Sequence, residues 1–235
     1  MILDISIVIP FHNEEESLRV LIPSLMEMIR FFTKSFEVIL VDDASTDSSV
    51  EIVKMYQEQY PIIKLIRLPK RGGQTGCYKE AFQQAKGLYI IRMDADLQDD
   101  PKDLPKFIEK INRGSELIMG LRECRKHSRI LRLASGIYDL IILALFNSPL
   151  HSNSGSYVAF KTELMKNIPF RKNDHRYLPL IAIRREAKNI TEVFVRHNKR
   201  KMGKSKYNPF EKLILGIPEV LLFLIRYIRG IYDLK

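Results

Sequence analysis

Short apolar runs alternate with amphipathic segments through the first 120 residues, and this alternation limits the folds open to the chain. Residues 5–10 (ISIVIP) form a nearly continuous apolar run, which is typical of a strand buried on both faces. Residues 15–32 instead repeat apolar side chains at helical spacing. We therefore expect an α/β protein with a mostly parallel sheet covered by helices. Further strands are expected at residues 36–41, 62–68, 89–93 and 116–120, and further helices at 50–59, 76–86 and 101–113.

The second half of the chain is less regular. Residues 213–225 (LILGIPEVLLFLI) are mostly apolar, but a helix needs about 20 apolar residues to span a membrane. We expect instead an amphipathic helix that lies in the membrane interface. The chain then divides into a domain of residues 1–210 and a C-terminal interfacial helix of residues 211–235. The other elements expected are helices at 130–146 and 177–185, strands at 152–160 and 190–197, and a basic loop at 199–206.

The composition excludes several classes of protein. With 46% hydrophobic and 28% charged residues, the 235-residue chain can form a packed core, so wholesale disorder is excluded. Two cysteines, Cys77 and Cys124, are too few for a disulfide framework, and no Cys/His cluster suggests structural zinc. The N-terminal residues lack the basic start and long apolar run of a signal peptide. We therefore expect a reducing, cytosolic environment.

The net charge differs between the two halves of the chain. Residues 1–120 hold 15 Lys/Arg and 19 Asp/Glu, a net charge of −4, whereas residues 121–235 hold 23 and 9, a net charge of +14. Basic surfaces bind nucleic acid, anionic membranes or phosphorylated substrates. The chain carries no recognised nucleic-acid motif, and its acidic half would repel a phosphate backbone, so nucleic acid is not an expected partner.

Acidic residues follow the second and fourth expected strands, at the edge where parallel sheets bind their ligands. Asp94 and Asp96 are spaced so that both can reach a hard cation such as Mg²⁺ or Mn²⁺, and Gln98 offers a neutral oxygen ligand. A solvated acidic loop is the alternative, but the buried strand before this motif favours the metal site. Asp99 and Asp100 are expected to be solvated or to lie at the start of the next helix.

The ends of the first and second strands offer further candidate residues. Asp42 follows a buried strand and can accept hydrogen bonds from a base or ribose. Ser45 and Asp47 are better explained as a helix N-cap cluster. Asn13 and Glu14 either face the same crevice or form a turn before a helix. The Gly72-Gly73-Gln74 stretch matches no phosphate-binding motif, and a tight turn explains it.

Residues 196–207 (RHNKRKMGKSKY) form the strongest basic feature of the chain. Such a run is usually a solvated face, and a nucleic-acid patch is a second interpretation. The acidic first half would repel a nucleic-acid backbone, so we expect this run instead to bind phosphate groups near the metal site. Arg122 and Arg132 are further candidates for phosphate binding.

Taken together, these motifs resemble family 2 glycosyltransferases of the GT-A fold, in the dolichyl-phosphate mannosyltransferase and polyprenyl-phosphate glycosyltransferase branch. The resemblance covers roughly residues 4–208. The chain departs from it at Ser152 and Val158, where close relatives often carry Asp and Arg. The matching stretches are residues 7–14 (IVIPFHNE), 41–47 (VDDASTD), 93–98 (MDADLQ) with Pro101, 154–156 (SGS), 175–179 (HRYLP) and Arg200-x-x-Gly203-x-Ser205-Lys206-Tyr207.

The resemblance implies an inverting, metal-dependent enzyme that transfers a hexose from a nucleoside-diphosphate sugar, of the GDP-mannose or UDP-glucose type, to a polyprenyl or dolichyl phosphate. Residues 1–120 would form the nucleotide-sugar and metal half, and residues 121–210 the acceptor half. The nucleotide sugar would be held by Pro10, Phe11, Asn13, Glu14, Asp42 and Asp94. Mg²⁺ or Mn²⁺ would be bound by Asp94, Asp96 and Gln98, and the acceptor phosphate by Arg122, Arg132, Arg200, Ser205 and Lys206. Asp96, Arg122, Arg132 and Arg200 are the expected catalytic residues.

The acceptor chemistry agrees with this assignment. A phosphate monoester has a second pKa of about 6 and is largely dianionic at pH 7, so its attack needs no strong general base. We expect the protein to lie peripherally on the cytoplasmic face of a membrane, attached by its own helices or by a membrane-anchoring protein partner. Two alternatives remain: transfer to a saccharide hydroxyl from the same donor, and a non-catalytic module that binds anions or membranes.

Overall fold

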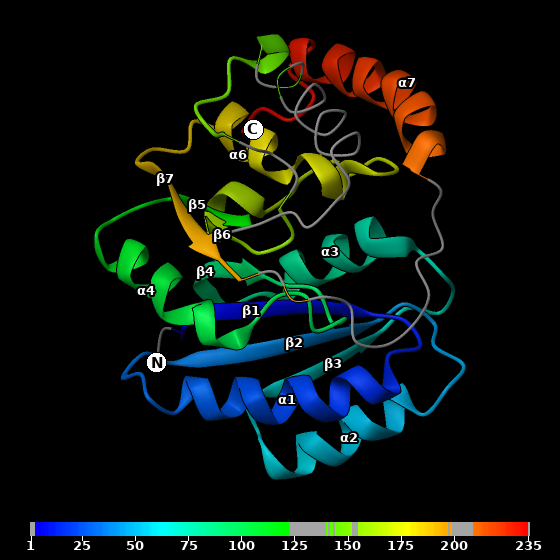
Figure 1. The fold of residues 1–235 in the computed structure, drawn as a ribbon, viewed down its shortest axis with the longest axis vertical. Coiled ribbons are helices and arrows are strands. Elements are labelled where there is room, and N and C mark those ends of the chain that lie inside the picture. The colour runs from blue at the N-terminus through cyan, green and yellow to red at the C-terminus, as the bar shows by residue number, and fades with distance from the viewer. Residues whose placement is uncertain are drawn as a thin grey trace.

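The computed structural model describes residues 3–122, 140, 142, 144–151, 155–196, 198 and 209–234, with residues 209–217 as backbone alone. Within these residues the chain forms a seven-stranded sheet in the order β3-β2-β1-β4-β6-β5-β7. Figure 1 shows this sheet between two layers of helices. The strands are β1 (Leu3–Phe11), β2 (Phe36–Asp42), β3 (Ile63–Arg67), β4 (Gly87–Arg92), β5 (Leu117–Arg122), β6 (Val158–Lys161) and β7 (Ile190–Val195).

The sheet is mostly parallel, as the alternation of strands and helices predicts. β1 pairs in parallel with β2 and β4, β2 with β3, and β5 with β7. β6 is antiparallel to both of its neighbours, β4 and β5. Six of these strands therefore run in one direction and end at one edge of the sheet, and β6 enters the sheet from that same edge.

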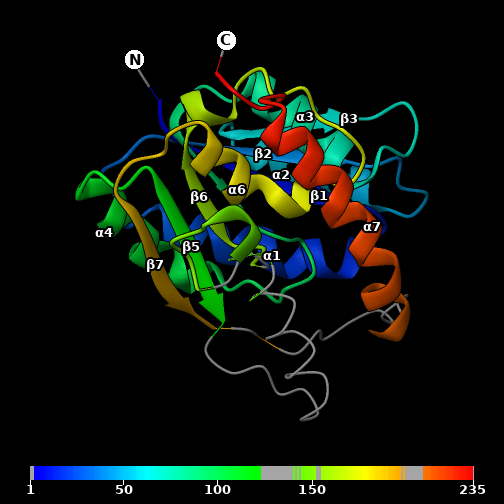
Figure 2. The ribbon, with the colours of Figure 1, turned by 90° about the horizontal axis from the view of Figure 1, so that it is seen from above.

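Helices cover both faces of the sheet. Apolar side chains of α1, α2 and α4 pack in one buried cluster with Ile5, Ile7 and Ile9 of β1. Those of α3, α6 and α7 pack in a second cluster, on the face to which Val8 points. Figure 1 shows the two helical layers on opposite sides of the sheet, and Figure 2 looks down onto the layer that holds α6 and α7. The helices are α1 (Glu15–Ile29), α2 (Ser49–Gln59), α3 (Gly73–Gln84), α4 (Leu104–Asn112), α6 (Leu178–Arg184) and α7 (Pro209–Ile228), with 3₁₀ turns η1 (Pro101–Asp103), η2 (Thr162–Met165) and η3 (Asp174–Tyr177).

The expected strands of the first half are confirmed to within two residues at each end. The strand expected at 152–160 is wrong at residues 155–157 and confirmed at 158–160, where the structure has Val158–Lys161; residues 152–154 lie outside the described residues. Before this strand, Gly155 lies so close to β5 that an added Cβ would be 2.7 Å from the carbonyl oxygen of Gly120. The expected helix at 130–146 is described only at its end, where Leu140, Ile142 and residues 144–146 are helical.

The C-terminal helix α7 is longer than the expected stretch and packs against the domain. Val220 and Phe223 are buried with Tyr232 in the second cluster. The opposite side of α7 exposes Leu221, Leu222, Ile225 and Ile228. Among the described residues, no helix combines the length and the apolar character needed to cross a membrane.

Candidate active site

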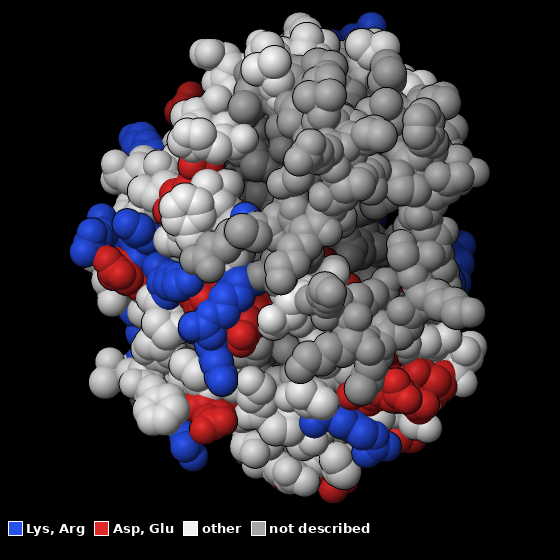
Figure 3. Space-filling model, viewed as in Figure 1, with Lys and Arg blue, Asp and Glu red and all other residues white. Residues whose placement is uncertain are grey.

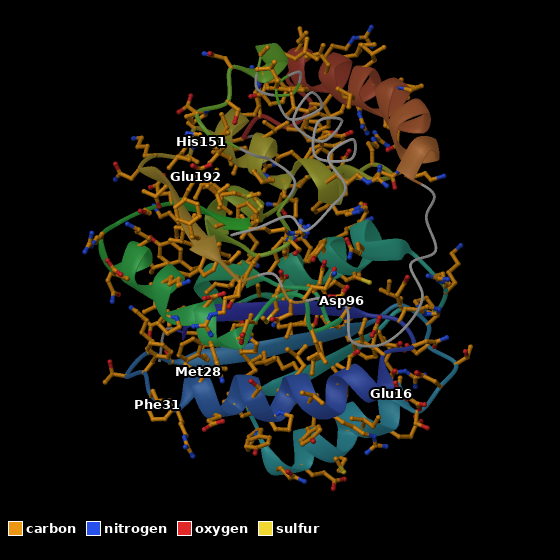
Figure 4. All side chains as sticks on the ribbon, in the orientation of Figure 1. Glu16, Met28, Phe31, Asp96, His151 and Glu192 are labelled. Carbon is orange, nitrogen blue, oxygen red and sulfur yellow. The ribbon has the colours of Figure 1, made fainter. Side chains whose placement is uncertain are left out.

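The ends of β1, β2 and β4 bring the sequence-predicted acidic residues to one edge of the sheet. Phe11 lies opposite Asp42 in the register of β1 and β2, and Val8 lies opposite Arg92 in that of β1 and β4. Figure 4 shows Asp96 beside the edge at which these strands end. The loops after the three strands therefore line one site, although they are far apart in the sequence.

The loops after β1 and β2 are joined by reciprocal hydrogen bonds. The Asn13 side chain accepts from the main-chain N–H of Thr46 at 2.8 Å and donates to the Thr46 hydroxyl at 3.2 Å. The main-chain N–H of Asn13 donates to Ser45 Oγ, and that of Glu14 donates to Ser49 Oγ. Asn13 has a left-handed φ of 54°, a conformation that asparagine tolerates better than most residues. Asn13 and Glu14 thus fix the shape of this part of the site.

Asp42 and Asp43 are both buried at the end of β2. Asp42 Oδ1 accepts from the Ser45 main-chain N–H at 2.8 Å. Among the described residues none donates a hydrogen bond to Asp42 Oδ2, which lies 3.6 Å from Arg67 Nε. A buried carboxylate oxygen without a donor is costly, and a ligand N–H or O–H at this position would satisfy it.

The Gly72-Gly73 turn binds Asp43. The main-chain N–H groups of Gly72 and Gly73 donate to Asp43 Oδ1 at 2.6 and 3.0 Å. Gly73 has a φ of +63°, which glycine adopts without strain, and it begins α3 three residues earlier than expected. The next residue, Gln74, donates from Nε2 to Asp94 Oδ1 at 3.3 Å. The turn predicted at Gly72-Gly73 therefore lines one side of the candidate site.

The Asp94-Ala95-Asp96 loop follows β4 and turns back on itself. Asp96 Oδ1 accepts from the Gln98 main-chain N–H at 3.1 Å, and Leu97 between them has a left-handed φ of 63°. Asp94 and Asp96 are both partly exposed, and their oxygen donors suit Mg²⁺ or Mn²⁺. Within the described part of the chain, no three His, Cys, Asp or Glu side chains converge as a metal site. A cation here would take its other ligands from Gln98, water or a substrate.

The prediction that Asp99 is solvated or begins a helix is wrong. Its side chain is buried, and its two oxygens accept from the Asp94 main-chain N–H at 3.0 Å and from Ser156 Oγ at 2.8 Å. Burial and the negative charge of Asp94 raise the pKa of Asp99 to about 7. Asp100 does cap the next turn, since its Oδ1 accepts from the Lys102 main-chain N–H. No local pattern distinguishes Asp99 from Asp100, because the burial comes from residues near β6.

Arg122 lies at the end of β5 and donates from Nη2 to Ser156 Oγ at 3.2 Å. The chain after β7 also returns to the acidic loop, where the main-chain N–H of Asn198 donates to the Gln98 carbonyl oxygen at 3.1 Å. The basic segment therefore starts beside the Asp94–Gln98 loop. The other predicted phosphate-binding residues, Arg132, Arg200, Ser205 and Lys206, lie outside the described residues, as does Ser152.

A partly buried polar cluster that the sequence did not predict connects α3, β4 and η3. His175 Nδ1 lies 2.8 Å from Thr75 Oγ1, and Arg92 Nη1 donates to the His175 carbonyl oxygen at 2.8 Å. Burial and the charge of Arg92 lower the pKa of His175 to about 3, so its imidazole is neutral at pH 7. Val158 is buried directly opposite Arg92 in the register of β4 and β6.

The surface beside the first loops is acidic. Glu15 and Glu16 occupy the first turn of α1, where negative charge is favourable for the helix dipole. Figure 3 shows acidic side chains gathered in this region, and Figure 4 labels Glu16 there. A phosphorylated ligand would need a cation or basic side chains to balance these carboxylates.

Comparison with known proteins supports the family suggested by the motifs. Residues 6–171 match the model of Glycosyl transferase family 2. The dodecaprenyl-phosphate galacturonate synthase of Rhizobium johnstonii is 29% identical over 228 residues, which cover 94% of this chain and 68% of that protein. The undecaprenyl-phosphate 4-deoxy-4-formamido-L-arabinose transferase of Salmonella choleraesuis is 32% identical over 211 residues, which cover 89% of this chain but less than two thirds (64%) of that protein.

Solved structures show the same fold. A glucosyl-3-phosphoglycerate synthase from Mycobacterium tuberculosis in complex with phosphoglyceric acid superposes with a TM-score of 0.70 and 17% identity, over 96% of this chain and 80% of that one. The same enzyme in complex with Mn²⁺, uridine diphosphate and glucosyl-3-phosphoglycerate gives a TM-score of 0.70 at 15% identity, over 94% of this chain and 80% of that one. At this identity the likeness establishes the fold alone.

Proposed function

This chain belongs to glycosyl transferase family 2, and from that premise we propose that it transfers a sugar from a nucleoside diphosphate to a polyprenyl phosphate at a membrane surface. The observation that carries the proposal is the hydrogen bond from Asn198 to Gln98, because it places the start of the basic segment beside the acidic loop. The relatives named for transfer to dodecaprenyl and undecaprenyl phosphate support the choice of acceptor.

The donor is held, in this proposal, by the loops after β1, β2 and β4. The buried Asp42 accepts a hydrogen bond from the base or ribose through Oδ2, which is otherwise unsatisfied among the described residues. Asn13 and Glu14, with Pro10 and Phe11, shape the wall beside it. The donor is of the GDP-mannose or UDP-glucose type.

Asp94, Asp96 and Gln98 would hold Mg²⁺ or Mn²⁺ on the diphosphate. When bound, such a cation offsets the charge that grows on the departing diphosphate. Gln74 donates to Asp94 and so orients this carboxylate from the side of α3. The related fold crystallised with Mn²⁺ and uridine diphosphate supports a divalent cation in this role.

The acceptor phosphate is held by Arg122 together with Arg132, Arg200, Ser205 and Lys206. These residues bring a dianion toward a donor that is itself anionic, and positive side chains are needed to offset the repulsion. The acceptor oxygen is already deprotonated, so no general base is needed. In a single displacement that inverts the anomeric carbon, the phosphate oxygen bonds to this carbon as its bond to the nucleoside diphosphate breaks, and the nucleoside diphosphate leaves.

The exposed side of α7 attaches the protein to the cytoplasmic face of a membrane. Leu221, Leu222, Ile225 and Ile228 project from one side of this helix, and the exposed Arg229 follows its last residue, whereas Arg226 is paired with the buried Asp174. Apolar side chains beside basic ones are typical of helices that lie in a membrane interface. A membrane-anchoring protein partner is the alternative means of attachment.

The direct test is a transfer assay with a panel of nucleoside-diphosphate sugars. Each is incubated with the protein, Mn²⁺ and either a short-chain polyprenyl phosphate or a free sugar, and the products are measured by mass spectrometry. We expect a lipid-phosphate sugar, and its loss when EDTA is added. Transfer to the free sugar alone, or full activity in EDTA, would contradict the proposal. A thermal-shift panel with the same donors identifies the nucleotide, because a ligand that binds the folded state raises the melting temperature.

A further inference from the structure

Asp99 is buried under the acidic loop and takes part in none of the roles assigned so far. Only 2% of its surface is exposed. Its Oδ2 accepts from the main-chain N–H of Asp94, and its Oδ1 accepts from the hydroxyl of Ser156. One carboxylate therefore joins the loop after β4 to the segment that leads into β6.

The geometry argues against Asp99 as a third metal ligand. Both of its oxygens accept hydrogen bonds from within the protein. In the parts of the chain that the structure describes, Asp94, Asp96 and Asp99 do not form a cluster that could hold a metal ion. Asp99 acts instead on the main chain of the residue that carries the first carboxylate.

The partner of Asp99 is itself held in place. Ser156 is buried, and its hydroxyl accepts from Arg122 Nη2 at 3.2 Å while it donates to Asp99. Gly155 before it lies against Gly120 of β5, where no Cβ would fit without movement. A chain of contacts thus runs from β5 through Arg122, Ser156 and Asp99 to Asp94.

The loop needs such an anchor because its backbone is strained. Leu97 adopts a left-handed φ of 63°, a conformation that costs a residue with a bulky side chain of order 1–3 kcal/mol. Such strain persists only where surrounding contacts fix the backbone. The bonds made by Asp99 hold the loop on one side of Leu97, at Asp94.

We propose that Asp99 is a positioning residue that fixes the main chain at Asp94 and so orients the carboxylates that bind the divalent cation. The inference rests on the proposed function, which places the cation at Asp94 and Asp96. Arg122 then acts in two ways, through Ser156 on the acidic loop and through its charge on the acceptor phosphate.

Asp103 provides a matched control. It is also a fully buried aspartate, and it follows Asp99 by only four residues. Its Oδ2 accepts from the Arg196 main-chain N–H at 2.7 Å, and its Oδ1 lies 2.8 Å from Lys106 Nζ. Asp103 therefore ties the same region to β7 and α4 without a bond to Asp94.

The test measures Mn²⁺ binding by the loss of the free-ion electron paramagnetic resonance signal, with UDP or GDP present, for the full chain. Asp99→Ala is expected to raise the Kd for Mn²⁺ about 10- to 100-fold, the usual effect of losing a residue that orients a metal ligand. Asp99→Asn keeps an acceptor for the Asp94 N–H and a partner for Ser156, so its Kd is expected within about three-fold of the wild type. Asp103→Ala is expected to lower the melting temperature without a comparable change in Kd.

The outcomes separate the inference from the function on which it rests. If the wild type binds no Mn²⁺ with either nucleotide, the proposed function itself fails. If the wild type binds but Asp99→Ala binds within three-fold of it, or if Asp103→Ala weakens binding as much, only the positioning role is overturned. Should Asp99→Ala not fold, Ser156→Ala removes one of the two bonds and is expected to weaken Mn²⁺ binding in the same direction, and an unchanged Kd would overturn the role.

Discussion

The loops after β1, β2 and β4 and the segments near β5, β6 and β7 form two sides of the candidate site, and they are stabilised in different ways. We call residues 12–14, 42–48 and 93–99 the donor edge, and residues 122, 155–157, 196 and 198 the acceptor side. Hydrogen bonds within the donor edge, such as those of Asn13 with Thr46, hold its loops to each other. The acceptor side is held largely by bonds to the acidic loop, from Ser156 to Asp99 and from Asn198 to Gln98.

This difference suggests an order of dependence. Damage to the donor edge should affect both donor and acceptor, because the acceptor side rests on it. Damage to the acceptor side should affect the acceptor alone, except at Arg122 and Ser156, whose hydrogen bonds lead to Asp99 and so support the donor edge. Four predictions test this comparison, from the largest expected effect to the smallest.

Asp96→Ala is expected to reduce transfer by at least about 10²- to 10³-fold, the range found when a group that stabilises transition-state charge is removed. The fold should persist, because Asp96 is partly exposed and outside the two apolar clusters. Steady-state rates with saturating donor and Mn²⁺, and the melting temperature, measure the two effects. Asp100→Asn, in the same loop, is the control and should retain most activity. Full activity of the Asp96 variant would remove the metal role.

Arg200→Ala is expected to lower kcat/KM for the polyprenyl phosphate about 10- to 100-fold, equivalent to one charge-assisted hydrogen bond. The KM for the nucleotide sugar should change little, because the donor edge does not depend on this residue. Initial rates with each substrate varied in turn separate the two constants. Equal loss in both would show that the basic segment also supports the donor, and unchanged kinetics would indicate a solvated face.

Leu222→Ala is expected to weaken binding to anionic vesicles about five-fold, since it removes apolar area worth about 1 kcal/mol from the exposed side of α7. Leu222 is 60% exposed, and Leu88 on β4, 54% exposed, is the matched control. Leu88→Ala should leave vesicle co-sedimentation unchanged. Deletion of residues 213–235 is a poorer test, because it also removes the buried Val220, Phe223 and Tyr232. Equal binding by both variants would exclude α7 as the attachment.

His175 joins the C-terminal half to α3, and its contribution to stability depends on pH. Its pKa is lowered from 6.5 to about 3 in the folded chain, so between these values the unfolded chain binds more protons. The folded state therefore loses stability as pH falls below about 6.5, by about 0.8 kcal/mol at pH 6. Urea unfolding of the wild type and of His175→Gln, compared at pH 7.5 and 6, measures this difference. A difference independent of pH would show that His175 titrates normally.

Much of the donor edge could be predicted from sequence because its residues lie next to the strands that place them. The apolar runs before Asp42 and Asp94 predict buried parallel strands, and such strands bring the residues after them to one edge of the sheet. Asp99 could not be predicted in this way. Its burial depends on Ser156, 57 positions later, and the neighbouring Asp100 has the same local pattern but remains a capping residue.

The contact between His175 and Thr75 could not be predicted from the sequence either, because 100 positions separate the two residues. Gln74 comes after a glycine pair that the sequence explains as a turn, and only the packing of α3 beside β4 brings its amide to Asp94. Asp99, His175 and Gln74 each lie in a stretch whose local sequence pattern does not indicate the contact that they make. Each contact depends instead on the distant element that packs beside the residue.

Periodicity and strand-end chemistry were enough to determine an α/β sheet, an acidic edge and a basic segment, because these depend on neighbours along the chain. Tertiary structure alone decided which carboxylate faces solvent and which is buried, and it decided that α7 packs one face in the core and exposes the other. Those outcomes depend on which distant segments meet. Asp96 and Asp99 are the same residue type three positions apart, yet packing leaves the first partly exposed and buries the second against Ser156.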